Sequence, residues 1–165
     1  MAKYLITFSE KGIALGGKPL EEQLQEEIDN NLLRLRSQAN QAEGDEKAKI
    51  VELIGKVEDR IRKNAKDKRG IEKDVLDGIL AAKAKGEAKA ADMFSCLDLA
   101  DRIQNAEDSI ELDEDDRKLL QGAYEKATKQ DAWFIHLRGL MRQIARPELV
   151  EEKKEDAKAE ATKPA

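Results

Sequence analysis

Residues 12–19, Gly-Ile-Ala-Leu-Gly-Gly-Lys-Pro, have the residue types and the spacing that could hold a nucleotide. In a phosphate-binding loop, the spacing G-x-x-x-x-G-K places backbone N–H groups around the phosphates, and a following Ser or Thr holds magnesium. Here the following residue is Pro19, which has neither a hydroxyl nor a backbone N–H. No apolar strand ending in Asp follows to complete a metal site. The sequence therefore favours a turn and a helix start over nucleotide binding, and it predicts no cofactor.

The segment from Glu107 to Asp116 contains seven acidic residues and no basic one, a composition that could bind a cation or a basic partner. An EF-hand loop that began at Asp113 would need glycine at its sixth position and a carboxylate at its twelfth. Lys118 and Tyr124 occupy those two positions. We therefore expect Asp113 to cap a helix within a solvated acidic surface, and we predict no metal ligands.

Basic residues are concentrated near the middle of the chain, where they could contact the phosphates of a nucleic acid. No aromatic residue lies nearby to stack on bases, and no DNA-reading motif follows. The segment also falls at an expected helix C-terminus, where the helix dipole favours cations. A solvated helix end is the favoured interpretation, and nucleic-acid binding is the alternative. The residues concerned are Arg60, Arg62, Lys63, Lys66, Lys68 and Arg69.

His136 is the single histidine and Cys96 the single cysteine, so the pattern contains neither a zinc site nor an evident Cys–His pair. Both have apolar or aromatic neighbours along the chain and are interpreted as packing residues. Asp98 and Asp101 share a helix face, but a carboxylate pair needs a common cleft before it can do acid–base chemistry. We therefore expect that the chain is not an enzyme and has no catalytic residues.

The composition limits what the surrounding elements can do. The chain has 165 residues, of which 39% are charged and 40% are hydrophobic, with a net charge of -5, which allows a modest core. No apolar run approaches the roughly 20 residues of a membrane helix, and residues 1–11 lack the apolar stretch of a signal peptide. The lone cysteine fits a reducing compartment. We therefore expect a cytoplasmic protein without a membrane partner.

Residues 4–8 alternate β-favouring side chains with a period of two and predict the clearest strand of the chain. Residues 9–12 indicate a turn and residues 13–15 a short return strand, which gives an N-terminal β-hairpin within residues 1–18. Residues 109–112 could add a further strand to it. Because a lone hairpin is only marginally stable in water, we expect it to pack on an apolar surface elsewhere in the chain.

From residue 20 the apolar spacing changes to three and four, which predicts an amphipathic helix that ends near Gly44. A second helix with the same spacing follows, so we expect an antiparallel helical hairpin within an arm of residues 19–90. Its apolar stripes exceed what a thin arm can bury, which favours self-association as a coiled-coil dimer. The residues assigned to self-association are Leu24, Ile28, Leu32, Leu35, Ile50, Ile54, Val57 and Ile61.

Helical spacing continues over residues 71–82, 93–103, 113–127 and 131–146, while residues 83–89 fit either an exposed helix or a linker. The aromatic residues lie at positions 4, 8, 94, 124, 133 and 134, outside the helical hairpin, and large rings dominate core energetics. We therefore expect the β-hairpin to pack on a compact helical body of residues 91–147. Residues 148–165, rich in Glu, Lys and Ala, predict a disordered charged tail.

Together these elements predict a mainly α fold with a minor β component: a helical hairpin arm, a small α-helical body and a short N-terminal β-hairpin. Because no catalytic constellation is present, we expect a non-catalytic protein-interaction module, an adaptor, an inhibitor or a small structural or assembly accessory protein. Small acidic proteins of this build are common among virus-encoded accessory proteins. The expected partners are another protein and a second copy of the chain.

Overall fold

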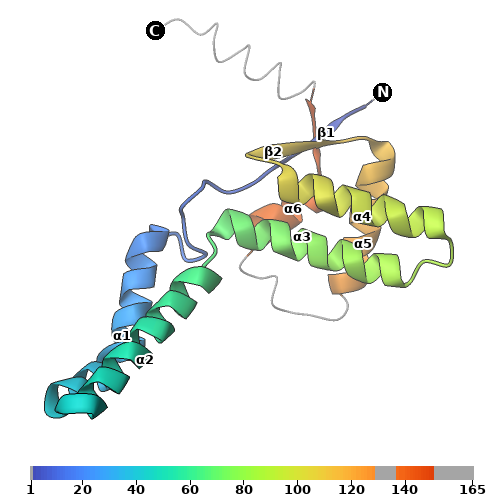
Figure 1. The fold of residues 1–165 in the computed structure, drawn as a ribbon. Coiled ribbons are helices and arrows are strands. Elements are labelled where there is room, and N and C mark those ends of the chain that lie inside the picture. Colours follow the sequence, from blue (N-terminus) through green and yellow to red (C-terminus); the bar gives the residue numbers. More distant parts are fainter. Residues whose placement is uncertain (1, 129–136, 151–165) are drawn as a thin grey trace, which may run out of the picture. The chain divides into compact units, whose positions relative to one another are not determined.

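The computed structural model describes residues 2–128 and 137–150, which form a mainly α-helical chain with a small antiparallel sheet, as predicted (Figure 1). These residues cluster into two compact units. The hairpin unit is Lys11–Arg69, and the sheet unit contains the residues up to Glu10 and those from Gly70 onward. The boundary at Gly70 differs from the expected end of the arm at residue 90. Within the described ranges, no helix combines the length and the apolar character that a membrane span requires.

The hairpin unit is built from two helices that pack against each other, α1 (Leu20–Gln41) and α2 (Gly44–Asn64). Only residues 42–43 connect them, so the two helices run antiparallel, as the sequence predicted (Figure 1). Gly44 at the start of α2 has a φ of 62°. This left-handed conformation carries a steric cost for residues with a Cβ atom but not for glycine, which explains the residue at this tight turn.

The sheet of the sheet unit has β1 (Tyr4–Thr7) at its centre, between β2 (Ser109–Leu112) and β3 (Glu148–Leu149). Both neighbours are antiparallel to β1, and Ile6 lies opposite Ile110. The strands expected at residues 4–8 and 109–112 are therefore confirmed as the centre and one edge of this sheet.

The return strand expected at residues 13–15 is wrong. Ile13 forms only an isolated bridge to Pro19, and its segment belongs to the hairpin unit. β1 pairs instead with β2, because Ile110 and Leu112 alternate in step with Ile6 and give the two strands one common buried face. Residues 148–149, expected at the start of a disordered tail, pair with β1 as well, while residues 151–165 lie outside the described ranges.

The remaining described helices are α3 (Lys68–Lys85), α4 (Ala90–Asn105), α5 (Glu114–Thr128) and α6 (Arg138–Ala145). Asp113 caps α5 as predicted, since its Oδ1 accepts a hydrogen bond from the Asp116 backbone N–H at 2.8 Å. The segment 83–89 is partly helix and partly linker, because α3 continues to Lys85 and α4 begins at Ala90. Of the helix expected over residues 131–146, residues up to 136 lie outside the described ranges.

Among the described residues, the buried side chains of the sheet unit are largely aliphatic. Phe8 is buried, but Phe94 is 60% exposed, and Trp133 and Phe134 lie outside the described residues. In α4, Cys96, Leu99, Ala100 and Ile103 are buried, whereas Leu97 is 36% exposed. The largest fully buried side chains of this unit are Ile6, Leu76, Leu80, Cys96, Leu99, Ile103, Leu112 and Leu120.

Candidate functional site

The residues assigned to self-association fall into two groups in the hairpin unit. Leu24, Ile28 and Leu32 of α1 are buried within the single chain, so they stabilise the monomer and are not available to a second copy. The other five are only half-buried, and all but the first belong to α2: Leu35, Ile50, Ile54, Val57 and Ile61. The apolar surface that one chain leaves uncovered is therefore concentrated on α2.

None of the residues of α2 is buried, although its apolar side chains have the spacing of a packing face. Val51 and Leu53, on either side of the half-buried stripe, are 53% and 46% exposed. α1 is one residue longer and buries four of its residues. The apolar stripe of α1 is therefore buried within one chain and that of α2 is not, which makes the face of α2 around this stripe a candidate binding surface.

Charges on α2 follow the helix dipole, with Asp45 and Glu46 in the first turn and Arg62 and Lys63 in the last. Arg62 Nε donates a hydrogen bond to Glu58 Oε1 at 3.4 Å, and its Nη1 lies 3.5 Å from Oε2 of Glu21 on α1. Exposed pairs of this kind contribute little to stability. They do reduce the positive charge that Arg62 offers to a ligand.

The basic residues proposed for nucleic-acid contact do not share one helix. α2 ends at Asn64 and α3 begins at Lys68, so the run spans a helix end, a linker and the first turn of the next helix. Arg60, Arg62, Lys63 and Lys66 are exposed, whereas Lys68 and Arg69 are half-buried. The Lys68 backbone N–H also donates to the Ile13 carbonyl at 2.7 Å. The expectation that the run occupies the last turns of a single helix is therefore wrong.

The glycine-rich segment 12–19 directs its backbone groups into the hairpin unit. The N–H of Gly12 donates to Asp67 Oδ2 at 2.8 Å, and the N–H of Ala14 donates to the Lys18 carbonyl at 2.8 Å. Lys18 Nζ lies 3.2 Å from Glu26 Oε1. A phosphate-binding loop needs these N–H groups and this ammonium group for its ligand, and here both have protein partners.

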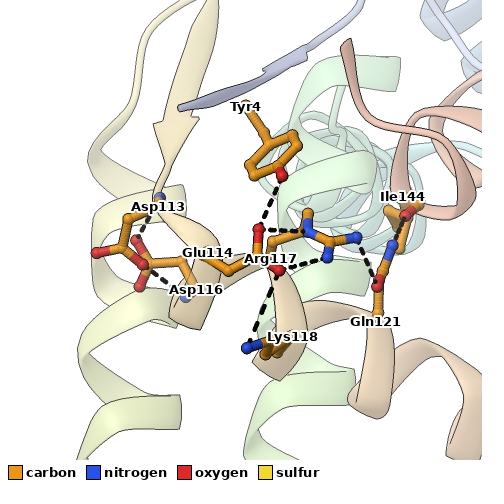
Figure 2. A network of polar contacts seen from close by, with 8 residues as sticks. All are labelled: Tyr4, Asp113, Glu114, Asp116, Arg117, Lys118, Gln121 and Ile144. Carbon is orange, nitrogen blue, oxygen red and sulfur yellow. Dashed lines mark hydrogen bonds and ion pairs between the residues drawn. The ribbon is translucent and has the colours of Figure 1, made fainter. Parts of the chain in front are cut away.

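A polar network in the sheet unit connects β1 to α5 and α6 (Figure 2). Tyr4 Oη donates a hydrogen bond to Glu114 Oε2 at 2.7 Å, and Arg117 Nη2 donates to Glu114 Oε1 at 2.5 Å. The Arg117 guanidinium carbon lies 4.9 Å from the centre of the Tyr4 ring. Arg117 Nη1 also donates to Gln121 Oε1 at 3.2 Å, and Gln121 Nε2 donates to the Ile144 carbonyl at 3.1 Å.

Of the contacts among Tyr4, Glu114 and Arg117, only the one between Glu114 and Arg117 could be predicted from the sequence. Glu114 and Arg117 have the spacing of a helical ion pair. Their contact with Tyr4 depends on strand pairing between segments far apart in the sequence, so no local pattern predicts it.

The pKa values of Glu114 and Tyr4 are both shifted further away from neutral pH. The hydrogen bond from Arg117, with a second from Tyr4, lowers the pKa of Glu114 from its ordinary value of 4.5 to about 2. The hydrogen bond to Glu114 raises the pKa of the Tyr4 hydroxyl, because the phenol must stay protonated to donate. An acid–base catalyst works best with a pKa near the working pH, so these shifts indicate a contact that holds β1 on α5.

Cys96 is fully buried in α4, and burial raises the pKa of its thiol, while the nearby Lys83 opposes this shift. Lys83 Nζ in turn lies 2.9 Å from Glu87 Oε1, and this hydrogen bond raises the pKa of the Lys83 ammonium group. A thiol with a raised pKa is a poor nucleophile at neutral pH. His136, the other residue with possible chemistry, lies outside the described residues.

Several acidic residues of segment 107–116 contact basic groups of the sheet unit. Lys3 Nζ lies 3.3 Å from Glu111 Oε2, and Arg102 Nη1 lies 2.8 Å from Asp116 Oδ2. Arg102 also donates to the Glu111 carbonyl at 3.2 Å. In residues 2–128 and 137–150, no three or more His, Cys, Asp or Glu side chains are grouped so that they could hold a metal ion.

Comparison with known proteins finds no family model, no curated protein and no solved structure that matches the chain.

Proposed function

We propose that the chain is a non-catalytic protein-interaction module, an adaptor, an inhibitor or an assembly accessory protein, that acts through the hairpin unit and associates with itself. The observation that carries this proposal is the incomplete burial of α2. This helix has a regular apolar stripe, yet none of its residues is buried in one chain.

Burying the apolar side chains of α2 against a partner would have a favourable free energy. Fully burying an exposed aliphatic side chain contributes about 1.5–3 kcal/mol, and Val51 and Leu53 are both about half exposed. A partner helix laid on α2 would also cover the half-buried Ile50, Ile54 and Val57. Leu53, Ile50 and Val57 lie side by side on the helix, so a single helical surface can cover these three.

The mass of the full chain in solution tests self-association directly. Sedimentation equilibrium from low to high micromolar concentration should give a mass above that of one chain. Replacing Leu53 by lysine should lower that mass, because a charge would then enter the interface. Leu33→Lys is the matched control, since Leu33 on α1 is 71% exposed. A wild-type chain that stays monomeric at high micromolar concentration would contradict self-association.

Nucleic-acid binding through the basic residues is the second candidate. Arg60 and Lys63 are exposed and have no hydrogen-bond or ion-pair partner among the described residues. Binding through them should weaken steeply with salt, and it should be lost when the exposed or half-buried cations of the run are changed to glutamine. The residues to change are Arg60, Arg62, Lys63, Lys66 and Arg69. If DNA and RNA show no mobility shift even at low salt, this candidate is excluded.

A further inference from the structure

Two opposite charges of α2, Glu46 and Arg60, lie at equal distances on either side of Leu53. Glu46 lies seven residues before Leu53, and Arg60 lies seven residues after it. Positions seven apart drift by only about 20° around an α-helix, so the three side chains follow one line along its surface. At a rise of 1.5 Å per residue, the two opposite charges lie roughly 10 Å to either side of Leu53.

All three residues of this line are free to meet a partner. Leu53 is 46% exposed, and Glu46 and Arg60 are exposed. Neither charged residue has a hydrogen-bond or ion-pair partner in the part of the chain that the structure describes. Elsewhere on the hairpin, charged residues such as Glu52 and Lys56 are paired with each other.

The line is self-complementary when two copies of α2 run antiparallel. With Leu53 against Leu53, each Glu46 then faces the Arg60 of the other copy, so two ion pairs flank an apolar centre. A parallel arrangement would place Glu46 against Glu46 and Arg60 against Arg60, and both contacts are repulsive.

We propose that α2 docks on α2 of a second copy in an antiparallel, two-fold symmetric contact centred on Leu53, so that two hairpins form a four-helix bundle. This inference rests on the proposed self-association and adds its orientation and register. The half-buried Ile50 and Val57 lie beside Leu53 on the helix and enter the same contact. The methylene stems of Lys49 and Lys56 cover the edges of this apolar centre.

The other exposed aliphatic residues of the hairpin unit, Val51 and Leu33, do not have this pattern. Seven positions to either side of Val51 lie a glycine and a glutamate, and for Leu33 they are a glutamate and an asparagine. An antiparallel contact centred on either residue would bring no opposite charges together at these flanking positions. Leu53 is therefore the centre that the charges support.

Charge exchange tests the orientation. Glu46→Arg and Arg60→Glu should each weaken the dimer of the full chain roughly tenfold, because each variant places like charges together at both ends. Mixing the two variants should restore dimerisation, since one chain then has arginine and the other glutamate at both positions, and both ion pairs re-form in the mixed dimer. Sedimentation velocity measures all three samples. In a parallel dimer the wild-type contacts are already repulsive, so neither exchange alone would weaken it. Separate variants that are as dimeric as the wild type, or a mixture that is no more dimeric than the separate variants, would show that the antiparallel pairing is wrong.

Disulfide formation tests the register. Leu53→Cys should give a covalent dimer under mild oxidation, because two residues on a two-fold axis face each other. Val51→Cys and Leu33→Cys are the controls and should cross-link much more slowly. The native Cys96 is fully buried, so the wild-type chain should give no covalent dimer. Cross-linking at Val51 or Leu33 as fast as at Leu53 would overturn the proposed centre.

The two proposals fail in different ways. A wild-type chain that is monomeric at high micromolar concentration overturns self-association and this contact with it. A wild-type dimer without rescue in the charge-exchange mixture and without selective cross-linking at Leu53 overturns only the antiparallel contact on α2.

Discussion

Single residues of the sheet unit show how ionised groups can serve the fold. Glu114 accepts hydrogen bonds from both Arg117 and Tyr4, so one carboxylate links a strand to a helix (Figure 2). Arg117 adds a stacking contact with the Tyr4 ring. These contacts need the ionised form of the carboxylate, which connects the stability of the sheet unit to pH.

Replacing Glu114 by glutamine should lower the melting temperature at neutral pH by a few degrees, because Arg117 and Tyr4 lose a charged partner. The folded pKa of about 2 lies below the ordinary value of 4.5. The stabilisation by Glu114 is therefore fully present above about pH 4.5 and is lost as the pH falls towards 2. Thermal unfolding followed by circular dichroism should show a steeper loss across this window in the wild type than in Glu114→Gln.

The matched control for this substitution is Glu125→Gln on the same helix. Glu125 is exposed, and its side chain has no partner in the described residues. Its replacement should leave the pH profile of the wild type unchanged. Identical profiles for the wild type and Glu114→Gln would contradict the role assigned to this carboxylate.

At the scale of residues, the sequence predicted local contacts and missed distant ones. The cap at Asp113 was predictable because its partner Asp116 lies three residues on. The hydrogen bond from Tyr4 to Glu114 was not, because it depends on the pairing of β1 with β2. For the same reason, the sequence assigned Leu24, Ile28 and Leu32 to self-association, although the neighbouring helix of the same chain helps to bury them.

At the scale of elements, the two faces of α1 should respond very differently to truncation. Leu32→Ala should lower the free energy of unfolding of the hairpin unit by about 2–5 kcal/mol, because Leu32 is fully buried. Leu33→Ala should change it by no more than about 0.5 kcal/mol, because Leu33 is 71% exposed. Urea unfolding of both variants measures the difference. Equal effects would mean that α1 does not pack through the Leu32 face.

Helices were predicted well from the sequence because their apolar spacing is local. The wrong predictions concern which side of a helix is buried and which segments pair as strands. In α4 a stripe through Leu97 and a stripe through Cys96 share Ala100 and Ile103, so spacing alone does not separate them, and packing selects Cys96. Residues 13–15 resembled a strand, but a strand needs a partner, and β1 has β2 and β3.

At the scale of the whole molecule, the two units have separate cores and should lose structure separately. Leu80→Ala, in the core of the sheet unit, should accelerate amide hydrogen exchange in α4 and α5 more than in α1 and α2. Leu32→Ala should have the opposite effect. Exchange measured by mass spectrometry on peptides resolves the units. A uniform acceleration in both variants would show that the chain opens as one cooperative body.

Unit boundaries were the least predictable feature. Because residues 71–82 continue the helical spacing of the preceding helices, we grouped them with the arm. The buried Val75, Leu76 and Leu80 instead belong to the core of the sheet unit, and the boundary falls at Gly70. Which helices pack together is decided by contacts between segments far apart in the sequence.

The central position of β1 has a consequence for synthesis on the ribosome. Its partners Ser109–Leu112 and Glu148–Leu149 are translated long after it, whereas Lys11–Arg69 can close into a hairpin as soon as it emerges. At about 5–20 residues per second, the nascent β1 waits on the order of several seconds with both edges unpaired. In that interval it is exposed to pairing with foreign strands, so a chaperone that shields Tyr4–Thr7 would raise the yield of native chain.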